Sequence, residues 1–415
     1  MSNPIALGCM LLIMVISISA SWYCKRYITS LDDFYVCGRN GSWWLFAGTT
    51  AATAMSMWTL IGAAGLASKW GLVPAMLYFS AIGMVIFVFF IGPPFRRAGF
   101  STIPEFFGAR YASDRVKSAA VLCTIVSLLS YIVVQLQGGA ILMEEVLGIP
   151  YLWGILLFGV LLIIGLLFSG MWAVVVTDAI GCFIIICISV YTLFYMIYAA
   201  GGWPDFLMGT IKYSGPSYWR PIGESGLSMS HHIANNLCWT VITAASPHLL
   251  NRALIVKDVK ELYKGGIASL LAIYVVASAI LLAFTGAVNF LNLSAIPVDY
   301  VAVNIALGVL PPLIGGLYLG GAFSAGITTA NTQVITCAQG FAKDIYQSII
   351  NPQSSEKDVL RLTSYAMIAV LAICGVITAF RPWFMVMAGT VTGVILSFGY
   401  FPSLVAGLFW ERGYC

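Results

Sequence analysis

The sequence predicts an all-α protein that crosses the membrane many times, on the strength of its composition and the length of its apolar runs. Of the 415 residues, 60% are hydrophobic and only 9% are charged, whereas soluble proteins contain about 45–50% apolar and about 25% charged residues. A chain so poor in charge cannot cover a water-facing surface, which argues against a cytosolic enzyme, a secreted disulfide scaffold and a DNA-binding protein. The net charge of +4 is too small to indicate a nucleic-acid partner. We therefore expect a multi-pass protein in the lipid bilayer of the plasma or inner membrane.

Eleven apolar segments of the chain are long enough to cross a bilayer, since one helical crossing takes about 20 residues. The ninth is unusually long and contains Pro311–Pro312, which predicts a short helix followed by the span proper. The predicted spans are residues 4–22, 43–67, 72–94, 118–143, 151–168, 173–199, 229–250, 265–289, 301–342, 360–380 and 384–409.

The positive charges orient these spans. With the N-terminus outside, sixteen of the twenty Lys and Arg residues, including Arg252, lie in inner loops and four lie in outer loops. Positive residues are retained on the cytoplasmic side, so this asymmetry fixes the orientation and supports the count. Basic residues follow the first run rather than precede it, the reverse of a signal peptide, so we expect a retained span. The four outer residues are Lys69, Lys212, Arg220 and Arg381.

Cysteine and histidine give little indication of metal or redox chemistry. Six of the ten cysteines lie inside apolar runs and none forms a CxxC pair, so we expect them to behave as small hydrophobic residues. The three histidines, His231, His232 and His248, lack the spacing of a zinc site. The longest outer loop, residues 201–227, is rich in Gly, Pro and aromatic residues, and we expect it to fold against the outer mouth.

Two of the predicted spans are unusual for lipid-facing helices. The second span is small and hydroxylated from Ala47 to Trp58, which suits either tight packing between helices or an interrupted helix whose free carbonyls face a cavity. The seventh contains Pro247, which removes a backbone donor, and the amides of Asn235 and Asn236. Such polar groups usually face a cavity or another helix.

The ninth span carries a polar stripe. Ala325, Thr328, Thr329 and Thr332 fall on one helical face, and three hydroxyls with a backbone carbonyl offer the oxygens that a hard cation prefers. The alternative is that each Thr hydroxyl bonds to the carbonyl four residues before it. The nearby Gly316 and Gly320 are most simply a close-packing face.

Asp178 is the only charge well inside a predicted span. An unpaired carboxylate at that depth is costly, so Asp178 should be paired, protonated or next to an ion. Glu144 and Glu145 lie at the outer end of the fourth span, where water reaches them. The chain of carboxylates that a proton relay needs is therefore missing from the spans.

Six segments resemble, in order along the chain, sequences that border the core helices of the sodium:solute symporter family. Together they extend over residues 33–412, and their joint occurrence is specific. The segments are DFYVCGR at 33–39, TIPEFFGARY at 102–111, GMWAVVVTD at 170–178, SPHLLNR at 246–252, KDIY at 343–346 and GLFWER at 407–412.

This resemblance implies a leucine-transporter-type fold of two inverted five-helix repeats, whose discontinuous first helices meet at mid-membrane. A leading helix and cytoplasmic loop (1–42) would precede the first repeat (43–200), and an extracellular loop (201–228) would separate it from the second repeat (229–412). Family members usually continue with two or more peripheral helices, which this sequence lacks. It resembles either a naturally short or a truncated member.

The resemblance also implies the site. A sodium ion would bind the carbonyls of Ala52, Met55 and Ala325 and the hydroxyls of Thr328 and Thr329, with Asp178 close by. A solute pocket beside it would contain Ser56, Tyr131 and Trp239, and Gln135 lies one helical turn from Tyr131. Sodium is the coupling ion and no other cofactor is implied.

Three positions depart from the proline symporter pattern. Ala54 replaces an aspartate, Thr243 a pocket tyrosine, and Trp172 an arginine or small residue. We therefore expect sodium-coupled symport of a small solute, either an amino acid such as proline or an organic acid anion such as pantothenate. A sensor module or a non-functional truncated member of the family are the alternatives. An intramembrane enzyme would need paired carboxylates or a Ser/His pair at depth, and the sequence shows neither. The oligomeric state is not predicted.

Overall fold

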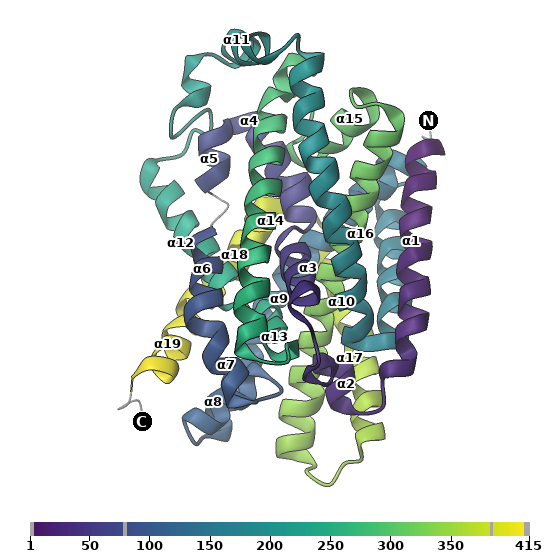
Figure 1. Cartoon of the computed structure of the whole chain (residues 1–415), viewed down its shortest axis with the longest axis vertical. Coiled ribbons are helices and arrows are strands. Elements are labelled where there is room, and N and C mark those ends of the chain that lie inside the picture. The colour runs from purple at the N-terminus through teal and green to yellow at the C-terminus, as the bar shows by residue number, and fades with distance from the viewer. Residues whose placement is uncertain (1–3, 78–80, 382–384, 411–415) are drawn as a thin grey trace.

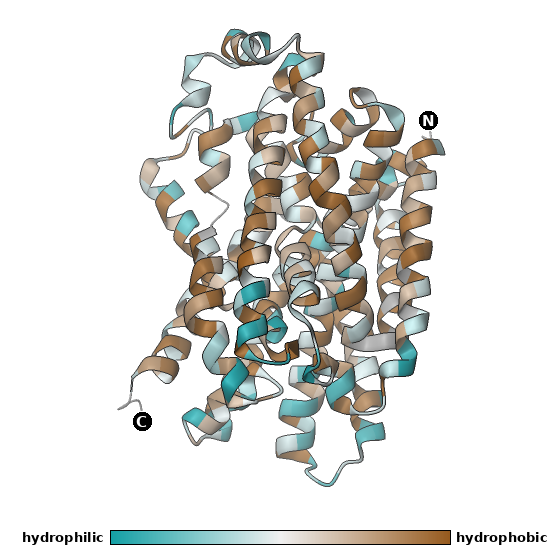
Figure 2. Cartoon of the chain, viewed as in Figure 1, coloured by the Kyte–Doolittle hydropathy of each residue, from teal (hydrophilic) through white to brown (hydrophobic). Residues whose placement is uncertain are grey.

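The computed structural model describes residues 4–77, 81–381 and 385–410. These residues form a bundle of helices that run mostly along one axis (Figure 1). Within the described ranges no β-strand forms; a single isolated bridge joins Gly41 and Val256. Hydrophilic residues gather at the ends of the bundle and hydrophobic ones along its length (Figure 2), as expected of a protein that crosses a bilayer.

The first half of the chain contains a leading helix and the helices of the first repeat. The second predicted span is divided between α3 and the pair η3 and α4, and the third between α5, α6, η4 and α7. The bounds are α1 Pro4–Cys24, α2 Leu31–Val36, α3 Trp43–Ala54, η3 Trp58–Ala63, α4 Ala64–Trp70, α5 Leu72–Leu77, α6 Ala81–Ile86, η4 Phe87–Ile91, α7 Gly92–Ala98, α8 Ile103–Arg110, α9 Asp114–Leu147 and α10 Tyr151–Ala199.

The second half contains the outer loop and the second repeat. As predicted from the Pro311–Pro312 pair, the short helix α15 precedes the long helix α16. The bounds are α11 Trp203–Ser214, η5 Pro216–Trp219, α12 Met229–Ala245, α13 Pro247–Ile255, α14 Val259–Thr285, η6 Gly286–Asn289, η8 Val298–Tyr300, α15 Val301–Gly308, α16 Pro312–Gln339, η9 Gly340–Ile350, α17 Glu356–Ala379, α18 Met385–Gly399 and α19 Phe401–Phe409.

The helical segment α10 covers two predicted spans and folds back on itself. Phe158 packs its ring against Phe323 of α16, with centroids 5.6 Å apart, and a Cβ placed on Gly181 would lie 3.1 Å from the hydroxyl of Ser324, the next residue of α16. A straight helix would hold residues 158 and 181 about 35 Å apart. The two limbs of α10 therefore run in opposite directions past the same point of α16.

The predicted spans account for the membrane-length helices of the described chain, and the short helices α2, α8 and α11 lie outside them. Seven helices are long and apolar enough to cross a membrane, and two bent pairs bring the number to nine. The other two predicted spans are the shorter apolar limb Tyr151–Ile164 and the interrupted pair α12 and α13.

Two helices are broken near the middle of the bundle. The axes of α3 and the segment Trp58–Trp70 differ by 51°, and Met55 leaves helical geometry at φ −100° and ψ 71°. In the second repeat, Ser246 has extended backbone and Pro247 begins α13, because proline fits the first turn of a helix but not its interior. The interruption expected of the second span is therefore confirmed.

The leading helix packs on the glycine face of α16. A Cβ on Gly316 would lie 3.0 Å from Cys9 Sγ and 3.1 Å from the Cα of Ala6, and a Cβ on Gly320 would lie 2.7 Å from Ile13. The predicted close-packing role of both glycines is confirmed, and α1 is their partner. The backbones of α1 and α16 therefore approach closely along this face, and α1 covers the glycine side of α16.

The outer loop folds over the end of the bundle, as expected (Figure 1). Phe206 of α11 occupies the space left by Gly286, where a Cβ would lie 1.9 Å from the ring. The buried hydroxyl of Tyr218 lies 2.8 Å from the carbonyl of Ala67 and 3.0 Å from that of Thr285. At the same end Glu144 accepts a hydrogen bond from Tyr300. It also lies 3.4 Å from Arg381, so it is not simply a solvated charge.

We expect Gly316→Leu to destabilise the folded protein, because the new side chain would overlap the backbone of α1. Overpacking of this kind costs about 1–3 kcal/mol, which should appear as a lower midpoint of thermal unfolding in detergent. Gly159→Leu is the matched control, since a Cβ on Gly159 meets no atom within 4 Å. Equal midpoints for the two variants would contradict the assigned contact.

Candidate ion and solute site

The two broken helices meet through aromatic rings. Trp58 follows the break of α3, and Trp239 lies on α12 before the break at Ser246; their ring centroids are 4.0 Å apart. Both indoles are buried. Contact between the interrupted segments of the two repeats places backbone groups freed by both breaks near the centre of the bundle.

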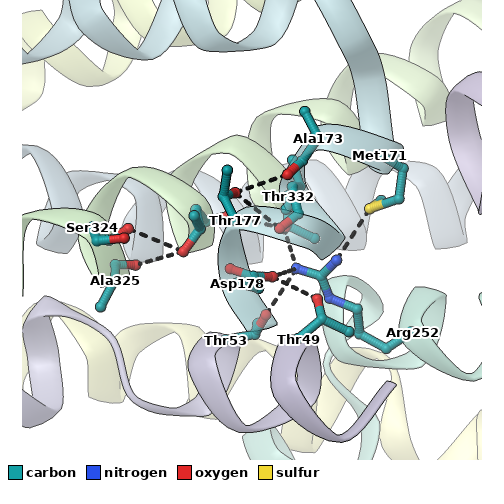
Figure 3. Close-up of polar contacts among 12 residues, drawn as sticks. Thr49, Thr53, Met171, Ala173, Thr177, Asp178, Arg252, Ser324, Ala325 and Thr332 are labelled. Atoms are coloured by element: carbon teal, nitrogen blue, oxygen red, sulfur yellow. Dashed lines mark hydrogen bonds and ion pairs between the residues drawn. The ribbon is translucent and has the colours of Figure 1, made fainter. Parts of the chain in front are cut away.

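A buried ion pair lies beside the break of α3. Asp178 Oδ2 accepts hydrogen bonds from Arg252 Nη2 at 3.0 Å and from Thr49 Oγ1 at 2.5 Å (Figure 3). The same guanidinium nitrogen donates to Thr53 Oγ1 at 2.8 Å and Thr332 Oγ1 at 2.5 Å. Both charged side chains are fully buried. One charge pair therefore connects α3, α10, α13 and α16.

The position of Arg252 differs from the sequence-based expectation. Counting charges placed it in an inner loop, but α13 continues inward from the break and buries the residue at 0% exposure. The remaining inner charges keep the asymmetry that orients the chain. Asp178 is accordingly paired, one of the three states expected for it, and its partner comes from the segment directly after the second helix break.

The threonine hydroxyls of the predicted stripe on α16 differ in their hydrogen bonds. Thr328 Oγ1 donates to the Ser324 carbonyl at 3.1 Å and lies 3.4 Å from that of Ala325. Thr332 is committed to Arg252 and to the Thr328 carbonyl. Thr329 Oγ1 is buried without a hydrogen-bond partner. The back-bonding alternative thus holds for two of the hydroxyls and leaves the third without a partner.

Other atoms around the break add to this oxygen set. Asp178 Oδ1 is buried without a hydrogen-bond partner, and Thr328 lies close enough to interact with that carboxylate. The carbonyl of Ala52 accepts a 3.2 Å bond from the Met55 amide, where α3 ends. Among the described residues, no group of three or more His, Cys, Asp or Glu could hold a metal. The available donors are hydroxyls, carbonyls and one carboxylate, which suits a hard monovalent cation better than zinc.

Four of the predicted pocket residues lie together. Ser56 Oγ and Tyr131 OH are 3.5 Å apart, and Gln135 Oε1 accepts a 3.2 Å bond from the Met57 amide. The rings of Tyr131 and Trp239 meet edge to face, with centroids 6.3 Å apart. The break of α3, the middle of α9 and the end of α12 therefore share one region.

Thr243, the fifth predicted pocket position, packs against a different helix from the other four. Thr243 Oγ1 bonds to the carbonyls of Trp239 and Thr240 in its own helix. A Cβ on Gly83 would lie only 2.0 Å from this hydroxyl, so Thr243 packs against α6. Trp172, the other departure in this part of the protein, contacts Tyr27, with ring centroids 5.6 Å apart.

Sequence reasoning missed Trp58 and His248 as site residues. His248 is buried, its Nδ1 lies 2.7 Å from Ser246 Oγ, and its ring contacts Tyr131 with centroids 5.7 Å apart. The available signal was its position directly after Pro247, which starts the helix beyond the break. Trp58 ends the small-residue run of the second span, and only the folded chain reveals that its ring meets Trp239.

Five of the six segments that carry the family resemblance contact one another. Thr102 donates to Asp344 Oδ1 at 2.7 Å, and Arg110 donates to the carbonyls of Gly407 and Trp410, both at 2.7 Å. Asp178 and Arg252 form a third pair. Glu411 and Arg412 of the last segment lie outside the described residues. These motifs therefore supply contacts between helices that are distant in sequence.

The pair of Asp178 and Arg252 should be needed for stability as a pair. Arg252→Met leaves a buried carboxylate uncompensated, which costs about 3–5 kcal/mol, and we expect a large loss of monodisperse protein and a lower unfolding midpoint. Asp178→Leu combined with Arg252→Met removes both charges and should restore most of that loss.

The control for this double-mutant cycle is Arg361→Met. Arg361 and Asp358 form an exposed pair with N and O 3.8 Å apart, which should contribute little. Arg252→Met protein as stable as wild type would contradict the assigned role of the buried pair.

Comparison with known proteins connects this geometry with transport. The sodium:solute symporter family model matches residues 34–413. The sodium/pantothenate symporter of Escherichia coli is 28% identical over 97% of this chain and 84% of its own length. The E. coli sodium/proline symporter is 22% identical over 93% of this chain and 79% of its own.

Solved structures share the fold. A Na+-coupled sialic acid symporter in a substrate-bound outward-open state superposes with a TM-score of 0.84 at 16% identity, covering 98% of this chain and 87% of that one. MhsT in complex with L-phenylalanine gives a TM-score of 0.55 at 15% identity, with 89% and 98% covered. These relatives are transporters rather than enzymes. With its two broken helices, its motifs in order and a family match over nearly the whole described chain, this multi-pass membrane protein belongs to the sodium:solute symporter family.

Proposed function

We propose that the chain imports a small organic solute together with sodium by alternating access, and that the ion binds between the break of α3 and the stripe on α16. The observation that carries this placement is a pair of buried oxygens without partners, Thr329 Oγ1 and Asp178 Oδ1, at the point where α3 is interrupted. Buried polar atoms are rarely left unpaired, so they indicate a missing ligand.

Each predicted ligand has a role in this arrangement. Ala52, Met55 and Ala325 offer carbonyl oxygens, and Thr328 and Thr329 offer hydroxyl oxygens. The hydrogen bond from Thr328 to Ser324 does not compete with the ion, because a hydroxyl that donates its proton keeps lone pairs to offer. Asp178 supports the ion through its charge, shared with Arg252.

The solute binds beside the ion in this proposal. Tyr131 and Trp239 supply flat apolar surfaces, each with a polar atom, and Ser56 and Gln135 supply hydrogen bonds. The related proteins carry pantothenate and proline by name, so the candidate solutes are an organic acid anion and an amino acid. Thr243 tunes the packing of α12 on α6 rather than the pocket itself.

Coupling follows from which helices each ligand joins. The ion connects the interrupted α3 with α16, and the solute connects the segment after the break with α9 and α12. Both ligands therefore stabilise an arrangement in which the two repeats are closed around them. A ligand shifts a conformational equilibrium only by its difference in affinity between the states, and two ligands that favour the same state bind cooperatively.

Thr329→Ala tests the ion site. Loss of one ligand oxygen should raise the sodium concentration for half-maximal uptake by about tenfold or more, which corresponds to about 1.4 kcal/mol. Thr329→Ser keeps the oxygen and should be milder. Thr378→Ala is the control, because that hydroxyl bonds to the carbonyl of Cys374 in its own helix, α17. Unchanged sodium dependence in Thr329→Ala would show that the ion binds elsewhere.

Trp239→Ala tests the solute site. Removing the indole should weaken solute affinity, measured as the concentration for half-maximal uptake at saturating sodium, while sodium binding to the solute-free protein stays nearly intact. Val241→Ala is a control on the same helix, at a partly buried position. If Trp239→Ala impairs both ligands and lowers protein levels, the indole serves packing instead.

A further inference from the structure

Three buried hydrogen-bond donors near the pocket have no partner. They are Gln135 Nε2, Asn235 Nδ2 and Trp239 Nε1, on side chains that are 0%, 4% and 3% exposed. An amide or indole N–H buried without an acceptor costs roughly 1–3 kcal/mol. Three in one region indicate a ligand that brings acceptors.

The positions of these donors converge on the break of α3. The backbone N–H of Met57 donates to Gln135 Oε1, so Nε2 of the same glutamine side chain lies beside the break. Trp239 stacks on Trp58 just beyond it. Asn235 lies one helical turn before Trp239 on α12, and its oxygen is taken by Thr390 of α18 at 2.9 Å.

Asn236 provides a contrast on the same helix. Its Nδ2 donates to the Leu77 carbonyl of α5 at 2.7 Å, so this amide is satisfied by another helix. The sequence predicted that both asparagines would face a cavity or a helix, and the structure separates them. One amide is used in packing, and the other keeps a free donor on the side of Trp239.

The charges near these donors favour an anion without a cationic group. Asp178 Oδ2 is committed to Arg252 and Thr49, and its Oδ1 belongs to the proposed ion site. Asp299 Oδ2 accepts hydrogen bonds from the Met385 amide at the start of α18 and from Gln137, and its Oδ1 has no partner. Met385 lies about one helical turn further out than Gly389, which contacts the Trp239 ring. The carboxylate oxygens without a hydrogen bond, Asp178 Oδ1 and Asp299 Oδ1, lie at the proposed ion site and further out along α18, whereas the unpaired groups around Trp239 are donors. A zwitterionic amino acid bound at Trp239 would bring its ammonium group to those donors.

We propose that the solute is a small organic acid anion that carries a carboxylate and neutral oxygen acceptors but no ammonium group, and that Asn235 is one of the residues that select it. This inference rests on the proposed function. Because the three donors are neutral, they do not compensate the charge of a buried carboxylate. The sodium ion bound next to them does, which makes anion binding depend on the cation.

The test compares solutes of matched shape in proteoliposomes with and without an inward sodium gradient. Radiolabelled pantothenate and proline are the transported probes. Tetrahydrofuran-2-carboxylate, which has a ring oxygen where proline has its ammonium, is a competitor. We expect sodium-driven uptake of pantothenate, and competition by tetrahydrofuran-2-carboxylate at least tenfold stronger than by proline.

The outcomes separate the two proposals. Sodium-driven uptake of proline in preference to pantothenate, with tetrahydrofuran-2-carboxylate competing no better than proline, overturns this inference and leaves sodium-coupled import in place. Absence of sodium-driven uptake for every probe overturns the proposed function itself. Loss of proline uptake in Asp299→Asn would assign the ammonium to Asp299 and also overturn the inference.

Asn235→Asp replaces the donor by a carboxylate of the same shape. We expect at least a tenfold higher half-saturating pantothenate concentration and a shift of preference towards proline, which now finds a partner for its ammonium. Asn236→Asp is the control, because it adds the same charge to the same helix on the side that faces α5. This variant should keep the preference of the unmutated protein between pantothenate and proline. Equal shifts in the two variants would show that Asn235 does not select the solute.

Discussion

The charge pair between Asp178 and Arg252 is the constraint on which the centre of this protein depends. Neither side chain reaches solvent, and desolvating two ions is repaid only when their remaining polar atoms are satisfied. The threonines at positions 49, 53 and 332 supply part of that satisfaction from α3 and α16, and Asp178 Oδ1 is left without a partner. The relative positions of four helices are therefore set by the geometry of one guanidinium and one carboxylate.

This ion pair also determines which neighbouring oxygen atoms remain free to bind a ligand. Thr332 is used by Arg252 and is not available to an ion, whereas Thr329 keeps its oxygen free. One oxygen of Asp178 is occupied and the other is not. The ion site and the solute site that we propose are consequently made from atoms that the packing of the helices leaves unsatisfied, near the interruption of α3.

Much of this arrangement follows from local sequence. The crossings, the break in the second span and the close-packing glycines depend on composition and spacing within one segment, and each was found in the structure. Arg252 was misplaced because its burial depends on a carboxylate 74 residues away, which no local pattern contains. The different orientations of Asn235 and Asn236, the packing of Thr243 on α6 and the meeting of Trp58 with Trp239 are also set by neighbouring helices. Their chemical types alone were not enough to assign them.

The paired charges have a consequence for how voltage acts on the transport cycle. A membrane potential exerts a force on net charge, worth about 2.3 kcal/mol per elementary charge per 100 mV. Asp178 brings its own counter-charge, so the two together contribute none as the helices rearrange. This pair therefore adds no electrical work to the cycle, and in the proposed transport of one cation with one anion the cargo is neutral, so the concentration difference of the cation drives it rather than the field.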